Sequence, residues 1–190
     1  GLSLVGSEMC IRDRFNRVVL VDKKNNEIGT EDKLEAHKKG LLHRAFSIFI
    51  FNDKNEILLQ KRAQSKYHSA GLWSNTCCSH PYNDKSINDY ANLRLVQEMG
   101  FETNLKEVFS FIYKANFENG LVEYEYDHVF FGKYNSDPTL NIDEASDFRW
   151  INFKQLLLEI GENPAKFTFW LKKIVQDYSL YFLNYENNNL

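Results

Sequence analysis

Residues 46–60 read FSIFIFNDKNEILLQ, and this stretch decides the fold class. The apolar run 46–51 is typical of a buried strand, residues 52–55 have the composition of a turn, and residues 57–60 can return as the partner of a hairpin. A similar pattern precedes it, with strands expected at 18–21 and 27–30 around a turn at 23–26. The first third of the chain is therefore expected to build a sheet.

The clearest helix is predicted at residues 86–99. Ser86 with Asp89 forms a capping box at its start, and Gly100 can end it. Between them runs an apolar stripe at a spacing of four, made of Ile87, Ala91, Leu95 and Met99. Further strands are expected at 108–115, 123–131 and 148–151, and helices at 153–160 and 165–183. This order predicts an α/β (α+β) fold in which helices pack on a mixed sheet.

The composition limits the classes of function. The chain has 190 residues, 43% of them apolar and 15% aromatic, which is enough for one domain with a substantial core. Its formal charge of −3 gives no general attraction to nucleic acid or to an anionic membrane, and no apolar run has transmembrane length. We expect neither as a partner, and we expect a monomer or a weak homodimer. An anionic ligand would need a local basic cluster.

The cysteines and the two ends of the chain set further expectations. Cys10, Cys77 and Cys78 are an odd set with two adjacent members, which fits free thiols in a reducing cytoplasm. Residues 1–14, GLSLVGSEMCIRDR, have no signal-peptide pattern and no continuity of composition with the rest of the chain. We treat residues 1–14 as a leader of doubtful native origin, residues 15–184 as a single domain, and residues 185–190 as a disordered polar tail.

Carboxylates in the second half of the sequence and a thiol in the first half suggest chemistry. Strand alternation puts Glu123, Glu125 and Asp127 on one face of the strand at 123–131. Taken alone, this segment fits a solvated charged face better than a cation site. The turn after Leu72-Trp73, however, brings a thiol and an imidazole together in Cys78-Ser79-His80. Imidazole and carboxylate together suit a divalent first-row metal or magnesium.

Several segments together resemble the type I isopentenyl-diphosphate delta-isomerases. The resemblance covers residues 17–183, and the stretch from Trp73 to Pro81 with the Glu-x-Glu pair downstream is its most specific part. The matching segments are Ala36-His37, His43-Arg44-Ala45-Phe46, Lys61-Arg62-Ala63, Gly71-Leu72-Trp73-Ser74-Asn75-Thr76-Cys77-Cys78-Ser79-His80-Pro81, Arg94 with Glu98-Met99-Gly100, and Glu123-Tyr124-Glu125. The resemblance implies a Nudix-like mixed sheet sandwiched between helices. It also implies interconversion of isopentenyl and dimethylallyl diphosphate with divalent metals.

The resemblance also implies catalytic residues. Cys78 and Glu125 match the pair that moves protons, and Tyr113 matches a tyrosine that assists near the glutamate. Trp170 matches a tryptophan over the tertiary carbocation, although without the resemblance it could equally be a core aromatic.

The same resemblance implies the ligands of metal and substrate. One divalent ion, Mn²⁺ or Zn²⁺, is expected at His37, His43, His80, Glu123 and Glu125. Glu98 is expected to hold Mg²⁺ that bridges to the diphosphate of a small-molecule substrate. The implied diphosphate contacts are Lys33, Arg62, Lys66 and Arg94, each of which alone would more often be a surface charge.

Three further residues have expected roles outside catalysis, and two other functions are possible for such a sequence. His68 is expected to be a solvated loop residue, His128 to be structural, and Cys77 to pack away from Cys78. A Nudix hydrolase is the nearest alternative, but residues 94–99 offer one glutamate where hydrolases need a crowded carboxylate helix. A metal-stabilised interaction domain is the non-enzymatic alternative, and the chain lacks the C-x-x-C spacing that structural zinc sites favour.

Overall fold

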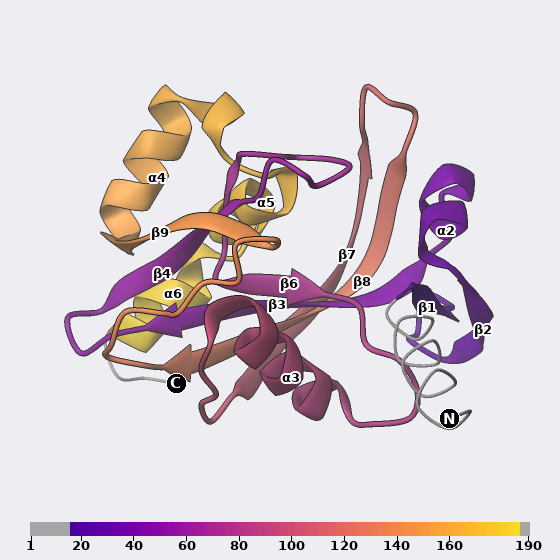
Figure 1. The fold of residues 1–190 in the computed structure, drawn as a ribbon, viewed down its shortest axis with the longest axis horizontal. Coiled ribbons are helices and arrows are strands. Elements are labelled where there is room, and N and C mark those ends of the chain that lie inside the picture. The colour runs from indigo at the N-terminus through magenta and orange to yellow at the C-terminus, as the bar shows by residue number, and fades with distance from the viewer. Residues whose placement is uncertain (1–15, 187–190) are drawn as a thin grey trace, which may run out of the picture.

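Strand β3 (His43–Phe51) is the centre of a nine-stranded mixed sheet (Figure 1). In the computed structural model, which describes residues 16–186, β3 runs parallel to β8 (Val122–Lys133) and antiparallel to β6 (Cys77–Ser79). The long β7 (Lys106–Asn116) pairs with β8 on its outer side. Strand β3 thus lies between the segment that carries the thiol and the segment that carries the paired carboxylates.

The remaining strands extend the sheet on either side of β3. Strand β4 follows β3 antiparallel and is itself flanked by β5 and β9, whereas β1 and β2 form an antiparallel hairpin beside the start of β3. Their bounds are Arg17–Val21 for β1, Glu27–Asp32 for β2, Glu56–Arg62 for β4, Trp73–Ser74 for β5 and Ala145–Asn152 for β9.

Helices cover both faces of the sheet (Figure 1). On one face Ile48 and Ile50 pack with Leu95 of α3, and on the other face Phe49 and Phe51 pack with Phe182 of α6. Because β3 is buried on both faces, its sequence is apolar almost throughout. The helices are α2 (Lys33–Lys39), α3 (Ile87–Met99), α4 (Phe153–Glu162), α5 (Phe169–Asp177) and α6 (Ser179–Glu186), with a 3₁₀ turn η1 at Pro164–Lys166. The predicted sandwich of a mixed sheet between helices is confirmed.

The capping prediction for α3 is also confirmed. The Ser86 hydroxyl accepts a hydrogen bond of 3.1 Å from the backbone N–H of Asp89, and Gly100 ends the helix with a φ of 79°. A side chain at Gly100 would meet the carbonyl oxygen of Thr139 at 2.6 Å, so this position requires glycine for space as well as for conformation. Each predicted strand is present, with its ends longer by up to three residues.

The single helix predicted at 165–183 is wrong. The chain instead forms η1, then α5, then α6, because Phe167 is extended and forms a parallel bridge with Trp73. The backbone N–H of Thr168 donates to the carbonyl oxygen of Trp73 at 2.9 Å, which ties this segment to the edge strand β5. A tertiary contact here overrides the helical periodicity of the sequence.

Three short elements were not predicted. Helix α2 begins after Asp32, whose side chain accepts from the backbone N–H of Glu35, and ends at Gly40 with a φ of 62°. Both signals are readable in the sequence. The two-residue β5 and the three-residue β6 are too short for a periodic signal, and they replace the simple turn expected before Cys78.

Helix α6 continues into the segment that was expected to be a tail. Tyr185 and Glu186 belong to α6, and the Tyr185 ring lies 4.1 Å from the ring of Phe51, so these two residues are not part of a disordered tail. The proposed leader, with Cys10, lies outside the described residues. The domain boundaries stay predictions. Cys77 and Cys78 are free thiols, and no helix within residues 16–186 is long and apolar enough to cross a membrane.

Truncation of Phe182 tests the core that α6 closes. Its ring is fully buried and stacks on Phe153 at 4.8 Å with an interplanar angle of 3°. Phe182→Ala should lower the free energy of unfolding by about 3–5 kcal/mol, because it removes buried surface and leaves a cavity. Leu180→Ala is the matched control on the same helix, since Leu180 is 70% exposed. Equal losses in urea unfolding of the two variants would contradict this packing.

Candidate active site

Most of the predicted site residues line one pocket at the ends of β3, β4 and β8. Of the thirteen that the sequence singled out, only His37 and His43 are not among its lining residues, and both adjoin it as fully buried side chains. The predicted residues that line it are Lys33, Arg62, Lys66, Cys78, His80, Arg94, Glu98, Tyr113, Glu123, Glu125 and Trp170.

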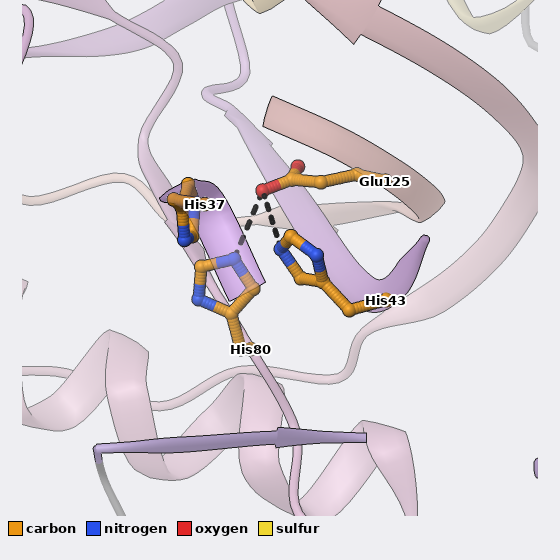
Figure 2. A group of neighbouring side chains, drawn as sticks. All are labelled: His37, His43, His80 and Glu125. Carbon is orange, nitrogen blue, oxygen red and sulfur yellow. Dashed lines mark hydrogen bonds and ion pairs between the residues drawn. The ribbon is translucent and has the colours of Figure 1, made fainter. Parts of the chain in front are cut away.

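Three imidazoles and one carboxylate form the histidine end of the pocket. Ligand atoms of His37, His43, His80 and Glu125 all lie within 4.8 Å of one another. His43 and Glu125 are neighbours because the parallel β3–β8 register pairs them directly, while His37 comes from α2 and His80 follows β6. Figure 2 shows His43 and His80 facing the same oxygen of Glu125, at 3.5 and 2.9 Å.

These side chains fit a divalent cation. Nδ1 of His37 bonds the carbonyl oxygen of Lys33 at 2.6 Å, and Nδ1 of His43 bonds that of Leu41 at 2.8 Å. Carbonyl oxygens only accept, so both Nδ1 atoms carry the proton and both Nε2 atoms keep a lone pair. Both Nε2 atoms are buried, and neither finds a hydrogen-bond partner within residues 16–186. Backbone-oriented imidazoles with inward lone pairs are typical of metal ligands.

The protonation states of His37 and His80 also suit the binding of a divalent cation. Burial lowers the pKa of His80 to about 3, and it also lowers the pKa of His37, so both rings are neutral near pH 7. The neutral ring is the form that binds metal. The four side chains could therefore hold a divalent metal ion.

A single phenol joins the two glutamates of β8. The Tyr113 hydroxyl lies 2.7 Å from Glu125 Oε2 and 3.0 Å from Glu123 Oε2, and all three side chains are buried. Burial, followed by the charge of Glu125, raises the pKa of Glu123 well above its usual range. Burial acts in the same direction on Glu125, but the imidazoles of His43 and His80 outweigh it and hold its pKa well below the usual range. The solvated charged face considered for this strand is wrong.

Glu123 does not belong to the group formed by His37, His43, His80 and Glu125. It contacts His68 instead, which was expected to be solvated. Its Oε1 lies 3.3 Å from Nε2 of His68, and these two side chains form a second group of candidate ligands with His37. The prediction that His68 is solvated is wrong, because its side chain is 7% exposed and stacks on Phe117. The sequence signal was proximity, since His68 follows Lys66, which was expected in the pocket, by two residues.

Four basic side chains also line the pocket. Lys33, Arg62, Lys66 and Arg94 come from α2, β4, the loop after β4 and α3, and the fold brings all four to the pocket. Arg94 donates to Glu98 Oε1 at 2.6 Å and to Glu144 Oε1 at 3.2 Å, and Lys66 also pairs with Glu144. Glu98 accepts a further bond of 2.9 Å from Gln60. The contacts made by Glu144 were not predicted.

The two adjacent cysteines have different surroundings. Cys77 is fully buried in the core beneath α3, which confirms its packing role, whereas Cys78 faces the pocket. Burial raises the pKa of Cys78 to about 12, so the thiol holds its proton near pH 7. His128 is structural, as predicted, since its Nδ1 lies 2.6 Å from Glu107 and its Nε2 3.1 Å from Asn25.

Trp170 closes the apolar side of the pocket. Its Nε1–H donates to Ser74 Oγ and Asn75 Oδ1, both at 3.0 Å, which fixes the indole plane. The guanidinium carbon of Arg62 lies 5.1 Å from the ring centroid. The π face of this buried indole already lies against one cation in the free protein.

Comparison with known proteins finds relatives that share one family and one fold. Residues 41–177 match the NUDIX domain. The chain is 52% identical over 162 residues to isopentenyl-diphosphate Delta-isomerase 2 of Photorhabdus laumondii, covering 85% of this chain and 92% of that protein. It is 49% identical to isopentenyl-diphosphate Delta-isomerase 1 of Aromatoleum aromaticum, covering 84% and 90%. A crystal structure from Deinococcus radiodurans shares the fold with a TM-score of 0.71 at 15% identity, covering 85% of this chain and 98% of that one.

Removal of His80 tests the metal end of the pocket. His80→Ala deletes the imidazole nearest to Glu125, so we expect the protein, loaded with Mn²⁺ or Zn²⁺ and then desalted, to retain much less metal than the unmodified chain. His128→Ala is the matched control, because His128 contacts a glutamate at a distance from the pocket. Metal content would be measured by atomic emission. A full complement in His80→Ala would disprove the site.

Proposed function

The chain belongs to the isopentenyl-diphosphate Delta-isomerase family of the Nudix superfamily, and from this we propose that its pocket interconverts isopentenyl and dimethylallyl diphosphate. One observation carries the proposal. The thiol of Cys78 and the carboxylate of Glu125 line the same pocket as four basic side chains. That combination suits a substrate with an anionic head and a hydrocarbon part that exchanges protons.

The reaction needs two groups that move protons. A shift of the double bond by one carbon requires protonation of an alkene carbon at one end and loss of a proton at the other, through a tertiary carbocation. We propose Cys78 and Glu125 as these groups. Burial raises the pKa of Cys78, and the surrounding histidines lower the pKa of Glu125, so the thiol is suited to give a proton and the carboxylate to take one. Because the reaction is reversible, each group acts as acid in one direction and as base in the other.

Tyr113 would assist Glu125. Its hydroxyl is the only donor shared by both glutamates among the hydrogen bonds of residues 16–186. Burial, with the charges of Glu123 and Glu125, raises its pKa well above the usual range, so the phenol remains protonated. A phenol at 2.7 Å from Glu125 can relay a proton between Glu125 and the substrate if it gives up its own proton to one as it takes a proton from the other, so that it stays neutral.

We propose that His37, His43, His80 and Glu125, with Glu123, hold one Mn²⁺ or Zn²⁺ ion. A bound divalent ion supplies positive charge that stabilises the paired carboxylates and tunes the proton affinity of Glu125. The histidines orient the Glu125 carboxylate through the oxygen at 2.9 and 3.5 Å, which leaves its other oxygen to Tyr113. The buried Nε2 atoms of His37 and His43 support this assignment.

The basic side chains of the pocket would bind the diphosphate. We propose direct contacts from Lys33, Arg62, Lys66 and Arg94, with Mg²⁺ carried in by the substrate and held by Glu98. Glu98 already lies beside Arg94, so it adds a carboxylate where substrate phosphates would gather. This arrangement supplies locally the positive charge that the chain as a whole lacks.

Trp170 is the proposed stabiliser of the carbocation. Its indole face is worth about 2 kcal/mol or more to a desolvated cation. Arg62 occupies that side in the free protein, and a diphosphate that draws Arg62 toward itself would leave the face to the substrate. The stabilisation then appears in the transition state rather than in the binding of the diphosphate.

The alternatives fit the pocket less well. Helix α3 contributes one carboxylate, Glu98, to the pocket lining, which argues against the clustered metals of a diphosphate hydrolase. A structural metal domain would not need a thiol, a phenol and four cations around one opening. A cytoplasmic location, a monomeric or weakly dimeric state, and the absence of nucleic-acid and membrane partners complete the proposal.

Proton exchange with solvent tests the function. The metal-loaded protein would be incubated with isopentenyl diphosphate and Mg²⁺ in deuterium oxide and followed by nuclear magnetic resonance. We expect dimethylallyl diphosphate to form and deuterium to enter both isomers. Release of phosphate would identify a hydrolase instead, and neither product nor exchange would identify a binding module.

The adjacent cysteines provide a matched pair of variants. Cys78→Ser should nearly abolish isomerisation with little loss of stability, because a hydroxyl transfers protons far less readily than a thiol. Cys77→Ser should keep most of the activity, since Cys77 lies in the core and not in the pocket. Initial rates and thermal unfolding would be compared. Equal loss of activity in both variants would defeat the assignment of Cys78.

Substitution of Trp170 tests the carbocation. Trp170→Phe keeps an aromatic face and should keep reduced turnover, whereas Trp170→Leu should lose much more. An ammonium diphosphate that mimics the cation should bind the Leu variant more weakly by about 1–2 kcal/mol, with inorganic diphosphate little affected. If both variants bind the mimic equally, another group must stabilise the cation.

A further inference from the structure

The most informative residue outside the proposed machinery is His68. Its imidazole lines the pocket with Nε2 at 3.3 Å from Glu123 Oε1, and its ring meets the edge of Trp170 at 5.9 Å. The side chain is 7% exposed although it belongs to the loop that follows β4. Loop side chains are usually exposed, so the burial of this imidazole beside a carboxylate of the site suggests that it has a role there.

The polar contacts of Glu123 indicate what this role is. Tyr113 occupies its Oε2, and His68 is the side chain near its Oε1. Glu125 differs, because two histidines of the metal group lie at its Oε1. A carboxylate that binds metal through one oxygen is normally held in place by hydrogen bonds from neighbours that are not ligands. Tyr113 bonds one oxygen of Glu123 at 3.0 Å, and Nε2 of His68 lies 3.3 Å from the other oxygen, within reach of such a bond.

The His68 ring is itself held firmly. It stacks on Phe117 with centroids 4.9 Å apart and an interplanar angle of 23°. Its carbonyl oxygen accepts a bond of 3.3 Å from Arg62, and the carbonyl oxygen of Tyr67 accepts one of 3.3 Å from Asn119. The loop is thus tied to β4 and to the turn between β7 and β8. A donor fixed in this way can fix its acceptor.

We propose that His68 is a positioning residue, which holds Glu123 oriented toward the metal ion without binding that ion. The proposal rests on the proposed function of the pocket and adds a residue to it. His37 has one available lone pair, on Nε2, because its Nδ1 bonds the carbonyl oxygen of Lys33. It therefore cannot serve two ions, one with His43, His80 and Glu125 and one with His68 and Glu123. A supporting role for His68 avoids this conflict.

Three variants separate the possible roles of His68. His68→Gln keeps an N–H donor, His68→Phe keeps the stack on Phe117 without a donor, and His68→Ala loses both. Mn²⁺ affinity would be measured by titration of the metal-free protein, together with kcat, KM and thermal unfolding. We expect Mn²⁺ binding about 10–100-fold weaker in the Phe and Ala variants and partly rescued in the Gln variant. The loss of activity should appear in kcat rather than in KM.

Other outcomes would overturn the proposal. Mn²⁺ binding preserved in the Phe variant but lost in the Gln variant would mean that His68 only packs. Unchanged binding in all three variants would mean that Glu123 needs no such support. If His68→Gln removes one imidazole nitrogen coupling from the electron spin echo of bound Mn²⁺, His68 is a ligand.

A control and an independent readout complete the design. His128→Gln should leave Mn²⁺ binding unchanged, because His128 contacts Glu107 and Asn25 and does not line the pocket. The metal titration does not depend on turnover. An unmodified protein that binds Mn²⁺ but makes no dimethylallyl diphosphate would refute the proposed function while the role of His68 is still measured.

Discussion

Two buried carboxylates that share one phenol impose the main constraint on this protein. Tyr113 has a single proton for Glu123 and Glu125, and a third acidic side chain, Asp127, follows on the same buried face with a bond of 2.8 Å from Ser47. Buried negative charge is costly unless it is compensated. The inward lone pairs of His37 and His43 increase the need for a positive ion. These groups are therefore suited to hold a divalent cation between them.

The fold meets this constraint through its central strand. The parallel pairing of β3 and β8 sets His43 beside Glu125, and the antiparallel pairing of β3 and β6 brings Cys78 opposite Ser47. Helices contribute Lys33 at the start of α2, Glu98 near the end of α3 and Trp170 in α5 to the lining of the pocket. Basic side chains, carboxylates and a thiol therefore line one opening.

Much of this architecture could be predicted from the sequence, and the failures have physical causes. Local signals sufficed for α3, whose caps at Ser86 and Gly100 are both present. They failed at residues 165–183, where the bridge between Phe167 and Trp73 breaks the helix. The pocket was identified because motifs distant in sequence matched one family. His68 was missed because its burial depends on Phe117, a contact across 49 residues that no local pattern encodes.

The location of the divalent ion tests the central claim most directly. Crystals grown with Mn²⁺ would be measured on both sides of the manganese absorption edge, so that anomalous scattering identifies the ion. We expect one peak at about 2.0–2.2 Å from Nε2 of His37, His43 and His80 and from oxygens of Glu123 and Glu125. A fully occupied peak elsewhere, or protein saturated with Mn²⁺ that shows no peak between these five side chains, would contradict the proposed site.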